Sequence, residues 1–93
     1  MTVAVLSVEL HLPLCGSLKD KRMVLRRLKD RLGHQNVAVA EVAYADLWQR
    51  AGLGIVTVAS SDQVAERTLQ SALETIERLE PDLVTSSHVE FIR

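Results

Sequence analysis

The feature that most constrains the fold of this chain is the alternation of two helical patterns with four strand-like patterns in only 93 residues. Apolar side chains at every second position indicate strands, whereas apolar side chains at intervals of three and four indicate amphipathic helices. The strand-like patterns cover residues 3–12, 36–44, 51–60 and 83–92. The helical patterns cover residues 18–32 and 62–79. The order along the chain is therefore strand, helix, strand, strand, helix, strand.

Capping residues and a proline set the expected ends of the helices. Ser17 is a suitable N-cap for the first helix, and Asp20 three residues later makes a weak capping box. Ser61 or Asp62 can cap the second helix. Pro81 ends that helix near residue 79, because the residue before a proline disfavours helical backbone angles.

This order of elements predicts one domain over residues 1–93 of the α+β class, with the ferredoxin-like βαββαβ arrangement. Its four-stranded antiparallel sheet carries both helices on one face. Right-handed crossovers place the first strand between the third and the fourth. Gly52 and Gly54 mark a bulge or a close backbone approach in the third strand. The second face of the sheet is left open to water, to a partner or to a second copy of the chain.

Composition excludes several classes of protein. No apolar run approaches the roughly 20 residues that cross a bilayer, and the first residues lack the basic start of a signal peptide. Cys15 is the only cysteine, so no internal disulfide forms, which is compatible with a cytoplasmic protein. We expect it to be an ordinary loop residue rather than a reactive thiolate. Glycine-rich nucleotide motifs, C-x-x-C and H-E-x-x-H are absent, so we expect no cofactor and no metal. The lack of a long apolar run means that we expect no membrane partner.

Positive charge is concentrated in the first helix. Seven of the eleven Lys and Arg residues lie in the stretch from Lys19 to Arg31. Residues 17–32 hold seven basic and two acidic side chains and the rest of the chain holds four and ten, so the net charges are +5 and −6. A cationic helix on an anionic body favours an anionic partner.

Lys19, Arg22, Arg26 and Lys29 form a stripe beside the apolar arc of this helix, whereas Lys21 falls within the arc in the first turn. Such a stripe can follow a phosphate backbone over about 15 Å, at a rise of ~1.5 Å per residue. The free N–H groups at the start of the helix can hold one more phosphate. The alternative is a solvated face whose charges pair with Glu residues elsewhere in the chain.

The connection between the second and third strands carries Trp48 beside Arg50. This pair can stack on a base or grip a partner protein. The structural alternative is that Trp48 covers the edge of the core and Arg50 pairs with Asp46. The first and third strands hold no aromatic residue, so RNA is expected to bind through helix and hairpin rather than by stacking on the sheet.

The open sheet face is expected to mix polar and apolar side chains. Its polar residues are Ser7, Glu9, His11, Ser86, His88 and Glu90. They form either ordinary polar surface or a metal or acid–base cluster. Val3, Val5 and Ile92 share this face and would be exposed to solvent in a monomer, which favours a homodimer.

The segments SLKDKRMVLRRLKDRL, VAVAEV, DLWQRAGLGI and VTSSH resemble the YlxP-like family of small bacterial proteins over essentially the whole chain. The pairing of S-L-K-[DE]-K-R with D-[LV]-W-Q-R is the specific part, because two unrelated motifs recur at matching separation. The resemblance implies a cytoplasmic bacterial protein of unknown function with a ferredoxin-like fold. Genes of the family often neighbour translation-initiation and ribosome-maturation genes, which implies an RNA or ribosome setting. The resemblance supplies no catalytic residues.

The sequence therefore predicts a non-enzymatic accessory protein that binds ribosomal RNA or a ribonucleoprotein, with no DNA partner. The predicted binding residues are Lys19, Lys21, Arg22, Arg26, Lys29, Trp48 and Arg50. One alternative is an interaction or regulatory module that acts as a homodimer, with the helix meeting an acidic protein surface. Another is a small phosphate-binding enzyme that uses Lys19, Lys21 and Arg22.

Overall fold

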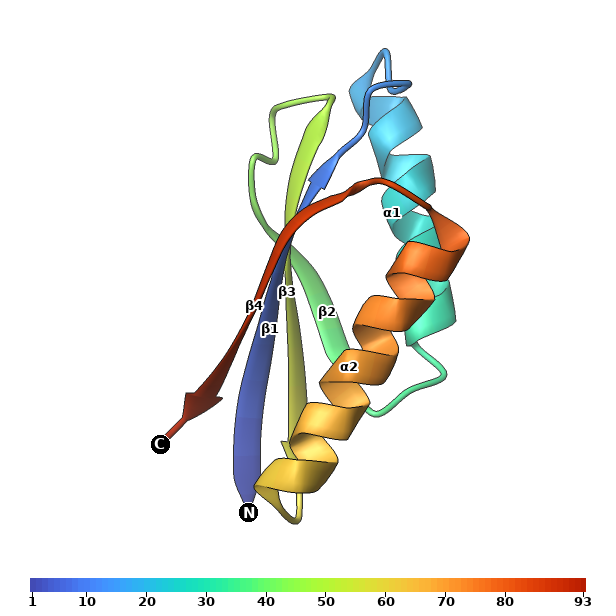
Figure 1. Cartoon of the computed structure of the whole chain (residues 1–93). Coiled ribbons are helices and arrows are strands. Elements are labelled where there is room, and N and C mark those ends of the chain that lie inside the picture. Colours follow the sequence, from blue (N-terminus) through green and yellow to red (C-terminus); the bar gives the residue numbers. More distant parts are fainter.

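A computed structural model describes residues 1–93, and its elements follow the predicted order (Figure 1). The strands are β1 (Thr2–His11), β2 (Ala38–Ala43), β3 (Arg50–Ala59) and β4 (Val84–Ile92). The helices are α1 (Leu18–Leu32) and α2 (Asp62–Leu79). The ferredoxin-like α+β class is thereby confirmed. Neither helix combines the length and the apolarity that a bilayer-crossing segment requires.

The four strands form one antiparallel sheet in the order β2-β3-β1-β4, so β1 lies between β3 and β4 as the crossover rule predicts. Both helices cover the same face of this sheet (Figure 1). The alternation along β1 decides which face is buried, because Ala4, Leu6, Val8 and Leu10 all point toward the helices and are at most 1% exposed. The opposite face carries no helix.

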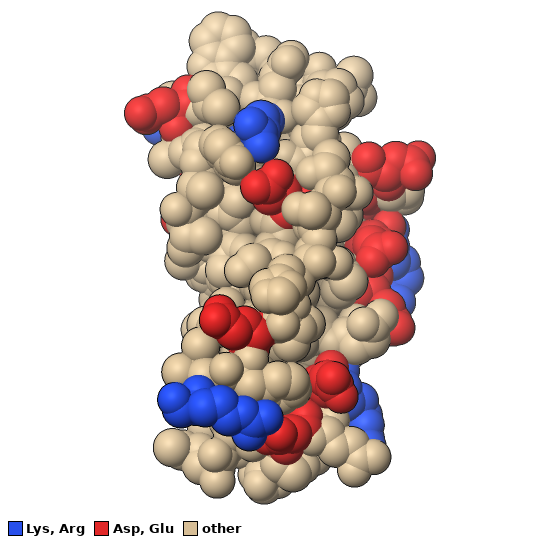
Figure 2. Space-filling model, turned by 60° about the vertical axis from the view of Figure 1, so that its left-hand side comes forward, with Lys and Arg blue, Asp and Glu red and all other residues tan.

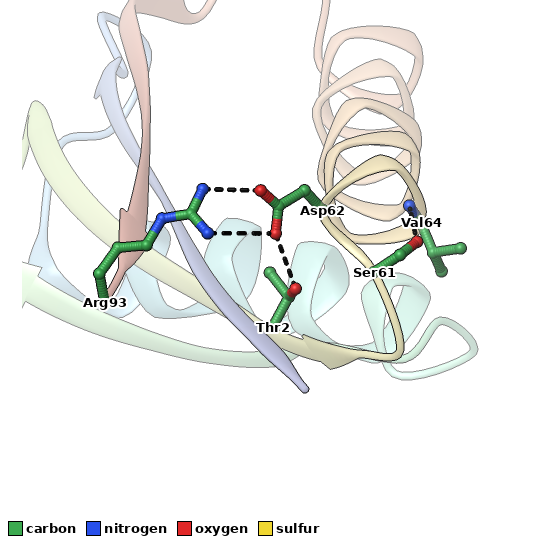
Figure 3. Close-up of polar contacts among 5 residues, drawn as sticks. All are labelled: Thr2, Ser61, Asp62, Val64 and Arg93. Carbon is green, nitrogen blue, oxygen red and sulfur yellow. Dashed lines mark hydrogen bonds and ion pairs between the residues drawn. The ribbon is translucent and has the colours of Figure 1, made fainter.

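Serine side chains cap both helices. The hydroxyl oxygen of Ser17 accepts the N–H of Asp20 at 3.0 Å. The hydroxyl oxygen of Ser61 accepts the N–H of Val64 at 3.2 Å, as Figure 3 shows. The carboxylate of Asp20 accepts the N–H of Gly16 at 3.0 Å, one residue before the cap. The first helix therefore begins with a variant of the expected capping box, in which the loop that leads into the helix is also held.

Gly52 is required by a close approach of β2 and β3. The pairing register shifts between Glu41 and Ala43, and a Cβ atom on Gly52 would lie 2.8 Å from the Cβ of Ala43. This confirms the close backbone approach expected at Gly52, whereas the extra residue of the bulge, Val42, lies in β2 rather than in β3. The chain then leaves β2 through Tyr44, whose φ of 62° is in the left-handed region that is uncommon outside glycine.

Both ends of the chain meet at the start of α2 (Figure 3). The carboxylate of Asp62 accepts hydrogen bonds from the guanidinium of Arg93 at 2.6 and 3.4 Å and from the hydroxyl of Thr2 at 2.8 Å. The bond from Arg93, followed by the one from Thr2, lowers the pKa of Asp62 below its ordinary value. Asp62 thus links β1, α2 and the C-terminal residue.

Candidate nucleic-acid interface

Four basic side chains of α1 form an exposed surface that we call the cationic face. It consists of Lys19, Arg22, Arg26 and Lys29. None of these residues takes part in the ion pairs of the chain. The expected pairing of this helix with a Glu residue elsewhere occurs for Arg27, which pairs with Glu80. The apolar side of α1 packs inward through Leu25, Leu28 and Leu32, which keeps the cationic face turned outward.

Shallow hollows lie on both flanks of the cationic face. Arg22, Arg26 and Lys29 line one of about 250 Å³, which the carboxylates of Asp30 and Glu41 also reach. Arg26 lies between this hollow and a second one of about 550 Å³.

The second hollow adds Arg31 to the basic surface and is also lined by His34. The sequence prediction missed both residues. Arg31 lies in the basic stretch but off the predicted stripe, and His34 follows the end of the helix, where helical spacing no longer applies.

Lys21 does not belong to the cationic face, which corrects the sequence-based assignment. Its side chain is buried, and its Nζ atom lies 2.8 Å from a carboxylate oxygen of Glu41. The same nitrogen donates to the carbonyl oxygens of Tyr44, Ala45 and Arg50 at 2.9, 3.1 and 3.3 Å. The cause is its position within the apolar arc of α1, which directs the side chain under the helix toward the loop between β2 and β3.

An ammonium group with that many internal acceptors has no free side for an external anion. We therefore remove Lys21 from the predicted binding residues. The phosphate-binding enzyme considered above loses one of its three basic groups for the same reason.

The loop between β2 and β3 is fastened to the loop that precedes α1. The side-chain amide of Gln49 donates to the carbonyl oxygens of Pro13 and Cys15 at 3.2 and 3.3 Å. The N–H of Leu12 donates to the carbonyl of Gln49 at 2.9 Å. Both loops lie at the same end of the molecule as the start of α1 (Figure 1). Gln49 therefore ties the end of the hairpin to the loop before α1 through both its side-chain amide and its backbone carbonyl.

Trp48 projects from this fastened loop with 52% of its surface exposed, so it does not cover the core. Arg50 pairs with Glu9 at 3.3 Å rather than with Asp46. Its guanidinium carbon lies 3.9 Å from the ring centroid of Tyr44, whose hydroxyl donates to Glu9 at 3.1 Å. The tyrosine ring and the carboxylate together fix the direction of the arginine.

Trp48 and Arg50 line an open hollow of about 480 Å³ at the tip of the hairpin, which we call the hairpin hollow. The remaining lining residues are His11, Asp46, Leu47 and Gln49. The structure thus brings Trp48 and Arg50 together, as the sequence pattern predicts. His11 also lines the hollow, because it lies opposite Arg50 where β1 pairs with β3.

The sheet face away from the helices carries few charges (Figure 2). Val3 lies between Val58 and Ile92 in the neighbouring strands, and those two residues are 51% and 52% exposed. Val5 and Val56 form the adjacent apolar pair. One end of this face is therefore an apolar row that the single chain leaves exposed.

The polar side chains expected on this face are present without forming a metal site. His88 lies opposite Ser7, and Ser86 lies opposite Glu9, as the alternation of β4 predicts. No group of three or more His, Cys, Asp or Glu side chains comes together to hold an ion.

Cys15 is 5% exposed and lies at the start of α1. Burial raises the pKa of its thiol, and the carboxylates of Asp20 and Glu80 raise it further, while Lys21 acts in the opposite direction. The net effect disfavours the thiolate form of Cys15.

The family model described as "Protein of unknown function (DUF503)" matches residues 3–89. The uncharacterized protein YlxP of Bacillus subtilis (strain 168) is 44% identical over 63 residues, which are 67% of this chain and 68% of YlxP.

Two solved structures have the same fold at low sequence identity. The designed ferredoxin-fold protein LFR1 1 has a TM-score of 0.59 at 12% identity, with 99% of this chain and 83% of that chain covered. A C-terminal segment of the alpha subunit of aIF2 from Pyrococcus abyssi has a TM-score of 0.54 at 19% identity, with 98% of this chain and 50% of that chain covered. These likenesses concern the fold. The sequence matches show that this chain belongs to the DUF503 family, which is the YlxP-like family that its motifs indicate.

Proposed function

We propose that this protein is a non-enzymatic accessory factor that binds ribosomal RNA or a ribonucleoprotein through the cationic face of α1. The observation that carries the proposal is that Lys19, Arg22, Arg26 and Lys29 are exposed and unpaired on one helix. The chain as a whole has a net charge of −1, so the rest of its surface repels a polyanion. RNA can therefore approach favourably from the side of α1. The proposal implies a cytoplasmic location.

The dimensions of the cationic face suit several consecutive phosphates. Lys19 and Lys29 are ten residues apart, which is about 15 Å along a helix axis at ~1.5 Å per residue. Each neutralised phosphate releases condensed counterions, which supplies binding energy at low salt. Trp48 and Arg50 provide a local anchor beyond the N-terminal end of this face.

The test is a titration of a labelled ribosomal RNA fragment at increasing salt concentration. If all four residues contact phosphates, the logarithm of the association constant should fall with the logarithm of the salt concentration with a slope of about −3. Arg26→Glu should weaken binding at low salt and make the slope shallower by about one unit. Arg67→Glu is the matched control, because it makes the same charge change at an exposed position of α2.

Absence of binding at low salt would reject the proposal, and so would binding that does not respond to salt. Equal effects of Arg26→Glu and Arg67→Glu would show that the net charge of the protein matters rather than the cationic face.

A second candidate, the interaction or regulatory module acting as a homodimer, is favoured by the apolar row of Val3, Val58 and Ile92. We infer that a second copy covers the open sheet face. The four strands have six to ten residues each, and at ~3.3 Å per residue and ~4.8 Å between strands they present a flat area of roughly 550 Å². A standard interface buries about 800 Å² per partner, so the open face approaches the required size.

Light scattering over a range of protein concentrations tests this candidate. The wild-type protein should have the mass of a dimer, and Val58→Lys should shift the equilibrium toward the monomer. Val64→Lys is the control, because Val64 is partly exposed on α2 and lies away from the sheet face. A monomer mass at high concentration would remove the homodimer.

A further inference from the structure

The hairpin hollow has the properties of a site for a flat ligand. It is open to solvent, has a volume of about 480 Å³ and combines an indole ring with polar side chains along its rim. Ligand sites commonly have volumes of this order, with an apolar surface and a few polar groups that orient the ligand. The chemistry of the lining residues therefore decides what class of ligand fits.

We infer that the hairpin hollow binds one unpaired nucleobase, so that the preferred ligand is RNA with an unpaired nucleotide rather than a continuous duplex. This inference rests on the proposed function and specifies the RNA that the cationic face would bind. Trp48 exposes half of its surface from a fastened loop, which leaves ring surface available for stacking. Stacking of a base on an aromatic side chain is favourable for every base, because each has a π-face.

Polar groups beside the indole can meet the edge of a stacked base. Asp46 supplies carboxylate acceptors, and His11 supplies a ring that can donate or accept a hydrogen bond. Neither side chain forms an ion pair within the chain. Arg50 is held against Tyr44 and Glu9, so its guanidinium forms a fixed wall of the hollow.

The buried Lys21 fixes the hairpin hollow relative to the cationic face. Its Nζ atom donates to the carbonyl oxygens of Tyr44 and Arg50, which border the loop that carries Trp48. Lys21 is itself part of α1, next in sequence to Arg22 of the cationic face. A strand whose phosphates follow α1 toward its N-terminus would therefore run toward the end of the molecule that carries the hollow (Figure 1). In this arrangement Lys21 is a positioning residue that does not contact the RNA.

Duplex RNA cannot use the hollow, because its bases are stacked and paired inside the helix. Sequence-specific and stacking contacts of proteins with RNA are made mostly to loops, bulges and ends, whose bases can be turned out. The hairpin hollow thus predicts a preference among RNAs of equal charge, which the cationic face alone does not.

The test compares two stem-loop RNAs of equal length and equal phosphate number. One has an ordinary loop, and the other has an abasic loop that keeps the phosphates but lacks the bases. Trp48 is the only tryptophan of the chain, so its fluorescence reports directly on the hollow. We expect quenching by the ordinary loop alone, and about tenfold or more weaker binding of the abasic RNA.

Variants measured with labelled RNA complete the test. Trp48→Leu should abolish the preference for the ordinary loop, whereas Trp48→Phe should keep most of it because it retains an aromatic ring. Leu14→Ala is the control, because Leu14 is almost fully exposed and does not line the hollow. Circular dichroism confirms that each variant is folded.

The outcomes separate this inference from the proposed function. Equal, salt-dependent binding of both RNAs without quenching would overturn the base site and leave the cationic face in place. An unchanged preference in Trp48→Leu would also overturn it. Absence of binding by either RNA at low salt would remove the proposed function and the base site together.

Discussion

The Nζ atom of Lys21 lies 2.8 Å from a carboxylate oxygen of Glu41, and this ion pair joins α1 to β2 beneath the cationic face. The lysine side chain is 2% exposed and the glutamate side chain is 20% exposed. The three hydrogens of this ammonium are directed at the backbone carbonyl oxygens of Tyr44, Ala45 and Arg50, so none is left for solvent. One buried charge thus connects a helix, an edge strand and a loop.

Lys21→Met is expected to destabilise the protein by about 3 kcal/mol, because it leaves the Glu41 carboxylate without its opposite charge and three backbone carbonyl groups without their donor. This is the low end of the range for buried pairs, since Glu41 keeps some contact with water. Urea unfolding measures the effect. Lys19→Met, at an exposed position of the same helix, should change the stability by less than ~0.5 kcal/mol. Equal stabilities of the two variants would contradict this account of Lys21.

Gly52→Ala is expected to destabilise the protein by about 1–3 kcal/mol, because the new methyl group would lie 2.8 Å from the Cβ of Ala43 unless the strands move apart. Thermal unfolding provides the measurement. Gly16→Ala is a suitable control, since the nearest atom to its added Cβ is a side-chain oxygen of Asp20 at 3.7 Å. A wild-type melting temperature for Gly52→Ala would mean that the bulge absorbs the methyl group at no cost.

Asp62 should make stability depend on pH at the acidic end. Its pKa is lowered in the folded state, mainly by the hydrogen bond from Arg93, from an ordinary value of 3.8. The stabilisation is therefore complete above that ordinary value and is lost as the pH falls through the lower folded-state pKa. The melting temperature of Asp62→Asn should be lower than that of the wild type at neutral pH, and the difference should shrink as the pH falls below 3.8.

Asp82→Asn is the control for the pH series. It makes the same chemical change at an exposed residue with φ of 68°, a conformation that asparagine tolerates. Its difference from the wild type should stay small and constant with pH. If the difference in melting temperature between Asp62→Asn and the wild type also stays constant with pH, Arg93 does not stabilise the charged form of Asp62.

Cys15 should react slowly with iodoacetamide in the folded protein, because it is 5% exposed and its thiol pKa is raised above the ordinary value of 9.0. Mass spectrometry of labelled samples gives the rate, and the same protein in concentrated urea gives the reference. Because the thiolate is the reacting form, the folded-state rate should still be increasing with pH at 9.0, the ordinary pKa of the thiol. Similar rates in buffer and in urea would indicate an accessible thiolate at the start of α1.

Local sequence patterns predict most of the fold because they act over a few residues. Ser17 and Ser61 cap the helices where serines are expected, since a cap needs only the next few N–H groups. Gly52 indicates the bulge through the absence of a side chain. The exposure of Trp48 and the partner of Arg50 were open questions, because they depend on which strands become neighbours.

The sequence by itself determined the order of the elements, the arrangement of the sheet and the concentration of positive charge on α1, because helical and strand periodicity are properties of short segments. Only the tertiary structure decided which of those charges reach solvent. Lys21 and Arg22 are adjacent in sequence, yet one is buried against Glu41 and the other is exposed. The reason is that the environment of a side chain is set by residues distant in sequence, here a strand and a loop about twenty residues away.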